Sequence, residues 1–541
     1  MLSTMMDVPL QVRRLLEHGG RIHAGSRVVT ADGDGTRTTT FAEVASNAAR
    51  LAHGLHGLGV RAGHRVATFM WNNAEHVEAY FAVPAMGAVV HPLNIRLFPD
   101  QVAYIANHAE DRVIIVDSSL LDGFARLLPQ LRSVRHVIVN GPGDWSVLEG
   151  TGVGVHDYAT LLAKQPDGYD WPDVDEREAA AMCYTSGTTG HPKGVVYSHR
   201  SIFLHSTAVA MPGGFALTEA DLVLAIVPQF HVLAWGLPYA AFLTGASLAM
   251  PDRYLVADRL ATFIGAARPT KGAGVPTVWT ALIEHVEANP EADISSLQEA
   301  VVGGSACPPS LMAAYDRHGI TMLHAWGMTE TSPLGTHGRP PAGASGADRT
   351  RYRLTQGRLV ASVEARLTGP DGSELPWDGR SVGELEVRGP WVAGSYYREP
   401  DSDAFDDGWL RTGDVGAITP DGYLILTDRA KDVIKSGGEW ISSVELEGHL
   451  MAHPAVAEAS VVGIPDDRWG ERPLGVVVPV NPAELSLPEL REFLADRVAK
   501  WQLPEHWAVV PEIPKTSVGK FDKKALRRAY AHHDLDVIDL G

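Results

Sequence analysis

Short apolar runs alternate with segments of helical composition along most of this chain. Each run has the length of a strand, and most of them end in glycine or proline turn signals. Strands that alternate with helices predict βαβ units and parallel sheets. The pattern occurs first at residues 65–139 and again at residues 222–303. We therefore expect an α/β fold with two doubly wound βαβ subdomains, in which ligands bind beyond the carboxyl ends of the strands.

The pattern changes after the second of these regions. Short alternating runs separated by Asp-Gly and Gly-Pro turns occupy residues 353–427 and predict a small β subdomain. The rest of the chain is typical of a compact α+β unit. We expect a large N-terminal domain at residues 1–430 and a small α+β domain at residues 431–541.

Composition excludes several classes of function. The chain has 541 residues, of which 45% are hydrophobic and 21% charged, so it is long enough for several cores. Its formal net charge of −19 argues against nucleic acid and anionic lipid as partners, because both require a basic face. Two cysteines are too few for a disulfide framework, and we expect Cys183 and Cys307 to be small core residues.

A stretch without charged residues, 223–251, is long enough to cross a bilayer. Prolines and glycines interrupt it, so a strand, a loop, a short helix and a second strand fit it better. The first residues contain an Asp and a Pro where a signal peptide needs an apolar core. We therefore expect a cytoplasmic protein without a transmembrane segment.

A loop rich in glycine and hydroxyl groups is the most specific motif in the chain. Residues 184–194 read YTSGTTGHPKG, with strand-like runs at 179–183 and 195–197. Glycines allow a ligand to approach the backbone, hydroxyls and N–H groups can surround phosphate oxygens, and Lys193 adds a positive charge. The spacing differs from that of the P-loop of nucleoside triphosphatases. On the Gly/Thr run alone, a surface turn is an equally good interpretation.

This string resembles the phosphate-binding loop of the adenylate-forming family, which includes acyl-CoA synthetases, luciferases and nonribosomal peptide adenylation domains. Further matching strings follow in the family's order: VGGS (302–305), AWGMTET (325–331), GWLRTGD (408–414), RAKDVIKSGGEWIS (429–442) and PKTSVGKF (514–521). The similarity extends over essentially the whole chain. GVVYSHR, PQFHVLAW and GVPTVW are most similar to bacterial medium- and long-chain fatty acyl-CoA synthetases.

The resemblance implies that a carboxylic acid reacts with ATP in the presence of Mg²⁺ to give acyl-AMP and pyrophosphate. The acyl group then passes to the thiol of coenzyme A. It also implies that residues 431–541 form a mobile domain, and it leaves a homodimer open. The residues that it assigns to the nucleotide are Thr185, Ser186, Gly187, Thr188, Thr189, Gly190, Lys193, Gly303, Gly304, Ser305, Trp326, Gly327, Met328, Thr329, Asp414, Arg429, Lys435 and Trp440.

The chemistry of these residue types agrees with the assignments. One carboxylate is enough for Mg²⁺ on a triphosphate, so Glu330 and Thr185 form the implied metal site. A carboxylate such as Asp414 accepts hydrogen bonds from both hydroxyls of a ribose. Lys520 matches the family's catalytic lysine, which stabilises charge at the α-phosphate. The implied catalytic residues are Lys520, Thr185, Lys193, Glu330 and His231.

The second step requires a change of position, because the lysine must leave before the thiol arrives. Lys431 matches the family's hinge, and Gly437 and Gly438 match the channel for the arm of coenzyme A. The acyl pocket implied by the resemblance contains His231, Trp235 and Val275.

Taken one at a time, these residues have plainer explanations. Glu330 would serve equally well as a cap or an ion-pair partner, Asp414 as a β-turn residue, Lys520 as a solvated cation and Trp235 as part of the core. The family usually has Tyr where Trp326 stands, so the aromatic hydroxyl is absent. The segment 356–367 also lacks prolines that are common there. Both departures indicate a specialised member.

Alternative functions follow from the same motifs. The enzyme could transfer the adenylate to an amine or a carrier protein, or activate an unusual small acid such as nitrite. AMP release without coenzyme A would favour this alternative. A non-catalytic ATP-binding protein of the same fold is a different class of hypothesis, and the intact Lys520, Glu330 and Thr329 argue against it.

Overall fold

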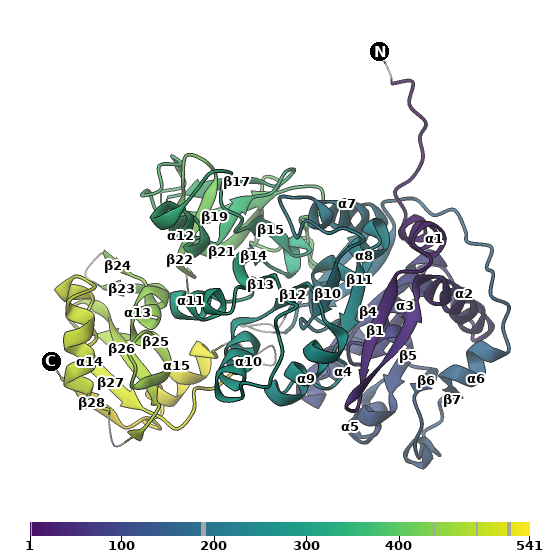
Figure 1. Cartoon of the computed structure of the whole chain (residues 1–541), viewed down its shortest axis with the longest axis horizontal. Coiled ribbons are helices and arrows are strands. Elements are labelled where there is room, and N and C mark those ends of the chain that lie inside the picture. Colours follow the sequence, from purple (N-terminus) through teal and green to yellow (C-terminus); the bar gives the residue numbers. More distant parts are fainter. Residues whose placement is uncertain are drawn as a thin grey trace.

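The computed structural model describes residues 1, 3–185, 191–369, 371–429, 431–436, 439–482, 485–516 and 521–540. Figure 1 shows a large body formed by the earlier elements and a smaller C-terminal unit, drawn in yellow and light green, at one end of it. The expected large N-terminal domain and smaller C-terminal domain are both present, and the boundary between residues 430 and 431 stays a prediction.

The first sheet carries the candidate phosphate loop. Its strand order is β7-β6-β5-β3-β4-β8-β9, in which every neighbouring pair is parallel except β8 and β9. Helices connect the parallel strands, as the alternating pattern predicted. The strands are β3 (Arg65–Phe69), β4 (Val89–Pro92), β5 (Asp111–Asp117), β6 (His136–Asn140), β7 (Gly154–Asp157), β8 (Ala179–Tyr184) and β9 (Gly194–Ser198). The helices are α2 (Phe41–Gly57), α3 (Ala74–Ala85), α4 (Pro99–Ala109), α5 (Leu121–Leu127) and α6 (Tyr158–Ala163).

The second sheet contains a parallel region in the order β14-β13-β12-β10-β11-β1. Its strands are β1 (Arg27–Asp32), β10 (Leu222–Ala225), β11 (Ser247–Met250), β12 (Lys271–Gly274), β13 (Glu299–Val302) and β14 (Thr321–Gly327), and β2 (Gly35–Thr40) pairs with β1 at the edge. The sequence did not predict that the hairpin of β1 and β2 joins this sheet. Its helices are α7 (His199–Ala210), α8 (Leu237–Thr244), α9 (Ala257–Ala267), α10 (Pro276–Ala288) and α11 (Pro309–Arg317), and α1 (Val12–Ile22) precedes β1.

The expected β subdomain is a continuation of the second sheet. Antiparallel β15 pairs with β14, and the order then runs β16-β22-β21-β19-β17-β18. The end of β14 and the strands β21 and β22 therefore belong to one continuous sheet. These strands are β15 (Leu334–His337), β16 (Gly357–Leu359), β17 (Glu364–Thr368), β18 (Glu374–Leu375), β19 (Gly383–Arg388), β20 (Phe405–Asp406), β21 (Trp409–Ile418) and β22 (Tyr423–Arg429), with helix α12 (Gly346–Leu354) before β16.

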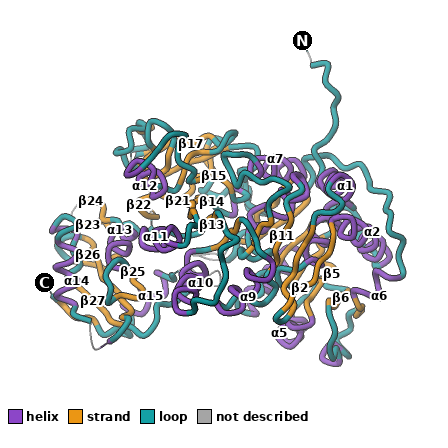
Figure 2. The backbone as a smooth tube through the Cα atoms, in the orientation of Figure 1, coloured by secondary structure: helices purple, strands orange, loops and turns teal. Residues whose placement is uncertain are grey.

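The C-terminal unit has its own sheet (Figure 2). It also has its own apolar clusters, which explains why it forms a separate domain. Its strands are β23 (Ile434–Ser436), β24 (Glu439–Ile441), β25 (Val456–Asp466), β26 (Gly470–Pro479), β27 (His506–Val509) and β28 (Val537–Asp539). Its helices are α13 (Ser443–Leu450), α14 (Leu487–Ala495) and α15 (Lys523–Ala531).

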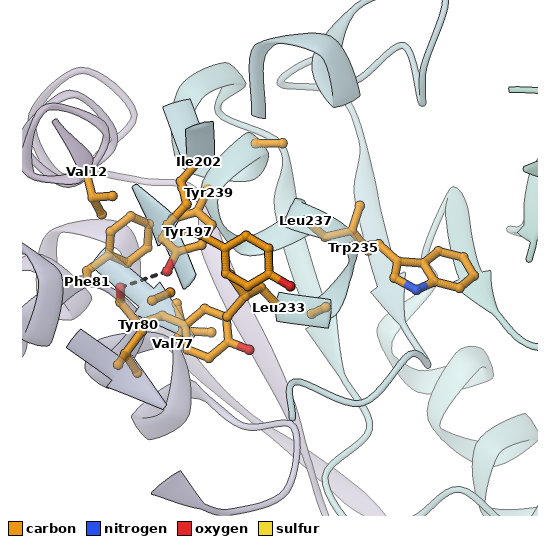
Figure 3. Packing of buried hydrophobic residues seen from close by; sticks show 14 of the residues in the cluster. Val12, Val77, Tyr80, Phe81, Tyr197, Ile202, Leu233, Trp235, Leu237 and Tyr239 are labelled. Atoms are coloured by element: carbon orange, nitrogen blue, oxygen red, sulfur yellow. Dashed lines mark hydrogen bonds between the residues drawn. The ribbon is translucent and has the colours of Figure 1, made fainter. Parts of the chain in front are cut away.

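The core between the first and second sheets is rich in aromatic side chains. Tyr80 and Tyr239 stack with ring centroids 5.7 Å apart, and Phe81 meets Tyr239 edge to face at 5.3 Å. Figure 3 shows this group, in which the hydroxyl of Tyr239 donates to the carbonyl of Tyr80. Burial of each such ring contributes about 1.5–3 kcal/mol to folding. This packing fixes the relative position of the two sheets.

Three smaller expectations also agree with the structure. Cys183 and Cys307 are buried and unpaired. Thr40 and Glu43 form a capping box at the start of α2. The apolar stretch 223–251 contains β10, a loop, α8 and β11, as its prolines and glycines predicted. In the part of the chain that the structure describes, every helix is too short or too polar to cross a membrane.

Candidate active site

The candidate phosphate loop leaves and re-enters the first sheet at one point. Thr185, directly after β8, donates its backbone N–H to the carbonyl of Lys193 at 2.9 Å. Lys193 in turn donates its N–H to the hydroxyl of Thr185 at 3.2 Å. Loop residues Ser186, Gly187, Thr188, Thr189 and Gly190 lie outside the described residues, so their phosphate contacts stay predictions.

The side chain of Lys193 is held by a segment that lies far along the chain. Its ammonium forms an ion pair with Glu399 at 3.2 Å and contacts the hydroxyl of Ser402 at 3.4 Å. It also lies 4.7 Å from the centroid of the Tyr396 ring, where a cation is attracted to the aromatic face. These contacts fix a cation at the end of the loop, and its binding of a phosphate stays a prediction.

Glu330 lies in a 3₁₀ turn, η5 (Thr329–Thr331), directly after β14. Its side chain is buried, and the hydroxyl of Tyr396 donates to its Oε1 atom at 2.6 Å. Burial raises the pKa of Glu330, while the hydrogen bond from Tyr396 and the charge of Arg429 act in the opposite direction. A buried carboxylate that has one bonded oxygen and a distant cation fits a Mg²⁺ ligand, because the metal supplies the missing positive charge.

The residues assigned to ribose meet an aromatic side chain. Asp414 and Arg429 face each other across β21 and β22, and Arg429 Nε lies 3.2 Å from Asp414 Oδ1. The indole N–H of Trp326 donates to Asp414 Oδ2 at 2.7 Å. Asp414 is the largest cause of the raised pKa of Arg429. Trp326 lacks the hydroxyl of Tyr, but it supplies a hydrogen-bond donor of its own.

Two glycines of the candidate nucleotide turns have no room for a side chain. A Cβ atom on Gly327 would lie 1.6 Å from the carbonyl oxygen of Pro333. On Gly303 it would lie 3.0 Å from the carbonyl oxygen of Ala325 and 3.2 Å from the ring of Trp235. These close approaches explain why both positions are glycine. The cation of Lys193 and the carboxylates of Glu330 and Asp414 are the groups that fit a nucleotide and its metal.

Trp235 lies in an unusual turn, η4 (Val232–Gly236), in which Val232, Leu233, Ala234 and Trp235 all have positive φ angles between 36° and 55°. Each non-glycine residue in this region costs about 1–2 kcal/mol, and such strain is concentrated at functional sites. Trp235 is 8% exposed and belongs to the main core cluster, which agrees with the plainer explanation of it as a core residue, and its place in the acyl pocket stays a prediction. In Figure 3 its indole points away from the tyrosines, and it contacts Gly303 of the nucleotide turn.

The other acyl-pocket candidates lie nearby. His231 precedes η4 and follows β10, and Val275 directly follows β12. Strands β10, β12, β13 and β14 are neighbours in that order. His231, Val275, Gly303 and Met328 thus all follow the carboxyl ends of adjacent parallel strands, where doubly wound sheets bind ligands. Gly304 and Ser305 continue the turn after β13.

The remaining candidates belong to the C-terminal part. Lys431 is exposed just after β22. Lys435 lies in β23, where its N–H donates to Glu471 at 2.8 Å, and Trp440 lies in β24. Gly437, Gly438 and Lys520 lie outside the described residues, so the assignments to the coenzyme A channel and the catalytic lysine stay predictions.

Sequence reasoning missed Tyr396 and Glu399, which contact predicted site residues. Both lie in the string GSYYREP at residues 394–400, in a segment without regular structure. A pair of tyrosines between turns is a weak signal by itself. Their importance follows only from contacts with residues far away in the sequence.

Comparisons with known proteins agree with this geometry. The family model described as "AMP-binding enzyme" matches residues 16–397, and "AMP-binding enzyme C-terminal domain" matches residues 445–520. A 3-methylmercaptopropionyl-CoA ligase of Ruegeria lacuscaerulensis is 42% identical over 97% of this chain and 98% of its own. A long-chain-fatty-acid–CoA ligase of Thermus thermophilus is 43% identical over 98% of this chain and 97% of its own.

Among solved structures, an anthranilate CoA ligase, AuaEII, in complex with anthranoyl-AMP is similar with a TM-score of 0.87 and 27% identity. The similarity covers 98% of this chain and 99% of that one. The matched strings, the arrangement of the two domains and these relatives all lead to one assignment: the chain belongs to the AMP-binding enzymes, the adenylate-forming family of ligases.

Proposed function

We propose that this protein is an AMP-forming acyl-CoA ligase. It joins a carboxylic acid to ATP, giving acyl-AMP and pyrophosphate, and then transfers the acyl group to the sulfur of coenzyme A with release of AMP. Mg²⁺ accompanies the ATP and neutralises charge on its phosphates.

One observation carries this proposal. Trp326, near the end of β14, donates its indole N–H to Asp414 at 2.7 Å, and Glu330 lies in η5 just after the same strand. The candidate ribose ligand and the candidate metal ligand are therefore parts of one site. They come from widely separated strings that the sequence matched independently. A site for an adenine nucleotide and its metal explains this convergence.

In the first step the protein has mainly to position reactants and stabilise charge. Lys193 binds phosphate oxygens at the loop, while Glu330 and Thr185 hold the metal. Asp414 accepts hydrogen bonds from the ribose, and Trp326 stacks on adenine. His231, Trp235 and Val275 border the acid. Lys520 brings positive charge to the α-phosphate as the acid attacks.

The second step uses movement of residues 431–541 about Lys431. Several hydrogen bonds span this proposed hinge: Ser443 donates its N–H to Asp428 at 2.7 Å, its hydroxyl donates to the same carboxylate, and the hydroxyl of Ser442 donates to the carbonyl of Thr427. Ser443 and Asp428 are buried, so these groups must find other hydrogen-bond partners when the domain turns. In this proposal the movement takes Lys520 away from the α-phosphate. It also brings Gly437 and Gly438 to the channel through which the arm of coenzyme A reaches the acyl-AMP.

We propose a fatty or aryl acid as the substrate. The relatives that share 42–43% of their residues with this chain are named for aliphatic acids, from 3-methylmercaptopropionate to long-chain fatty acids. Aliphatic acids are therefore the first to test. We also place the enzyme in the cytoplasm, where ATP and coenzyme A are available, and its two unpaired cysteines suit a reducing compartment. A homodimer is the assembly to test by mass measurement in solution.

The test is a panel assay. Purified protein, ATP, Mg²⁺ and coenzyme A are mixed with fatty acids of increasing length and with aryl acids, and AMP and acyl-CoA are measured. We expect both products with at least one acid, and no acyl-CoA when coenzyme A is omitted. AMP release at an equal rate without coenzyme A would show another acceptor. Absence of AMP with every acid would contradict the proposed function.

A further inference from the structure

Tyr396 lies between two charged side chains of the candidate site. Its hydroxyl donates to Glu330 Oε1 at 2.6 Å, and its ring centroid is 4.7 Å from the ammonium of Lys193. Tyr396 is 9% exposed and Glu330 5%, so the hydrogen bond between them is shielded from water, whereas the side chain of Lys193 is 34% exposed. One residue thus contacts the proposed metal ligand through its hydroxyl and the proposed phosphate-binding cation through its ring.

The backbone around Tyr396 is attached to both of these neighbours. Ala393 donates its N–H to the carbonyl of Glu330 at 2.7 Å. Tyr397 donates its N–H at 2.8 Å to the carbonyl of Gly194, the residue after Lys193. The ring itself packs edge to face on Phe405, with centroids 5.1 Å apart. Tyr396 therefore has little freedom to move away from either contact.

We propose that Tyr396 is a positioning residue for adenylation: its hydroxyl fixes the carboxylate of Glu330 for Mg²⁺, and its ring holds the ammonium of Lys193 toward the phosphates. This inference rests on the proposed function of the same site. The phenol of Tyr396 donates to Oε1 of Glu330, so the other carboxylate oxygen is the one that would bind Mg²⁺. Mg²⁺ demands near-ideal octahedral geometry, and residues that orient a metal ligand change affinity by about 10–100-fold when they are lost.

The two contacts of Tyr396 can be separated by substitution. Tyr396→Phe keeps the ring and removes the hydroxyl, so only Glu330 loses a partner. Tyr396→Leu also removes the ring face from Lys193. Glu399 and Ser402 still contact that lysine, so we expect the second effect to be smaller.

The first experiment measures binding of ATP as a function of Mg²⁺ concentration, by calorimetry and by AMP formation. We expect Tyr396→Phe to require about ten-fold more Mg²⁺, with a smaller loss of the rate at saturating Mg²⁺. The matched control is Tyr352→Phe, which removes a hydroxyl that donates to the carboxylate of Asp421 at 2.8 Å in the β subdomain. We expect no change in Mg²⁺ dependence for this control. An unchanged Mg²⁺ requirement in Tyr396→Phe would overturn the inference.

The second experiment isolates the ring. We expect the apparent Kd for ATP to be about two- to five-fold higher in Tyr396→Leu than in Tyr396→Phe, which corresponds to the loss of an ordinary cation–π contact. In a Lys193→Met background the same change should have no effect on ATP binding. An equal rise in both backgrounds would mean that the ring has only a structural role. Melting temperatures of all variants are measured in parallel.

Measuring ATP binding by calorimetry distinguishes a failure of this inference from a failure of the proposed function. A wild-type protein that binds ATP with Mg²⁺ but forms no AMP with any acid would contradict the proposed reaction. The change in the Mg²⁺ concentration that Tyr396→Phe requires for ATP binding would still test the role of Tyr396. A wild-type protein that binds no ATP at all would overturn both.

Discussion

The indole N–H of Trp326 donates to the carboxylate of Asp414 at 2.7 Å, and both side chains are buried. Trp326 ends the parallel part of the second sheet, whereas Asp414 lies in β21 of the β subdomain. The hydrogen bond therefore joins the aromatic residue proposed for adenine to the carboxylate proposed for ribose. It fixes one oxygen of Asp414, while Arg429 is 3.2 Å from the other. The adenine and the ribose of a nucleoside would therefore be bound by two side chains, Trp326 and Asp414, that are joined by a hydrogen bond.

We predict that Trp326→Phe weakens ATP binding. Phenylalanine keeps an aromatic face for adenine but cannot donate to Asp414, which loses a charge-assisted hydrogen bond worth about 1.5–3 kcal/mol. The KM for ATP should rise by about ten-fold or more, with little change in the KM for the acid. The control is Trp377→Phe, at an exposed tryptophan of the β subdomain. An ATP KM equal to that of the wild type in Trp326→Phe would show that the hydrogen bond has no role in binding.

We predict that Gly327→Ala destabilises the protein severely. Its Cβ atom would lie 1.6 Å from the carbonyl oxygen of Pro333, a backbone atom that cannot rotate away. The turn after β14 must therefore shift, at a cost of about 3 kcal/mol or more. The melting temperature is the measurement, and Gly168→Ala is the control, because nothing lies within 4 Å of a Cβ atom there. Equal melting temperatures for the two variants would contradict the geometry of this turn.

Local sequence predicted the elements that carry the site and failed where distant segments meet. The strands around Thr185 and the turns after β13 and β14 were predicted because apolar periodicity and glycine turns are properties of adjacent residues. The junction of β14 with β15, which makes the β subdomain part of the second sheet, was not predicted. Strand pairing depends on tertiary contacts, and no local pattern encodes it.

The same limit applies to the site. Glu330 and Lys193 were predicted because each lies in a specific string. Tyr396, which contacts both, was not, because a tyrosine in a loop has no local signal of function. Trp326 was assigned to the nucleotide, and the sequence showed only that the hydroxyl of the usual Tyr is absent. Its hydrogen bond to Asp414 becomes visible only when β14 and β21 are placed side by side.

Glu78 should make the stability of the protein depend on pH. It is buried in α3, where Tyr158 and Asn47 donate to its carboxylate at 2.5 and 2.7 Å. Burial, followed by the charge of Glu75, raises the pKa of Glu78 from 4.5 to about 8. Between pH 4.5 and 8 the unfolded chain ionises this residue and the folded chain does not. The free energy of unfolding therefore falls as pH rises through this window, by up to about 1.4 kcal/mol per pH unit, and levels off above it.

Glu78→Gln removes this ionisation and keeps a similar shape. We expect its stability relative to the wild type to increase from pH 5 to pH 8, measured by urea unfolding at both values. Other titrating groups cancel in the difference. Glu17→Gln, at an exposed position of α1, is the control and should show a constant difference. A constant difference for Glu78→Gln as well would mean that this carboxylate ionises normally in the folded protein.

We predict that substitution of Lys520 affects the two half-reactions unequally. If this lysine stabilises charge at the α-phosphate, Lys520→Ala should reduce AMP formation from acid and ATP by about 100-fold or more. Transfer from preformed acyl-AMP to coenzyme A should change by less than about three-fold, because the lysine leaves the site before the thiol arrives. Lys515→Ala is the matched control in the same segment, and its side chain pairs with Glu458 at 2.5 Å. An equal loss of both half-reactions in Lys520→Ala would mean that the tail does not exchange positions between the steps.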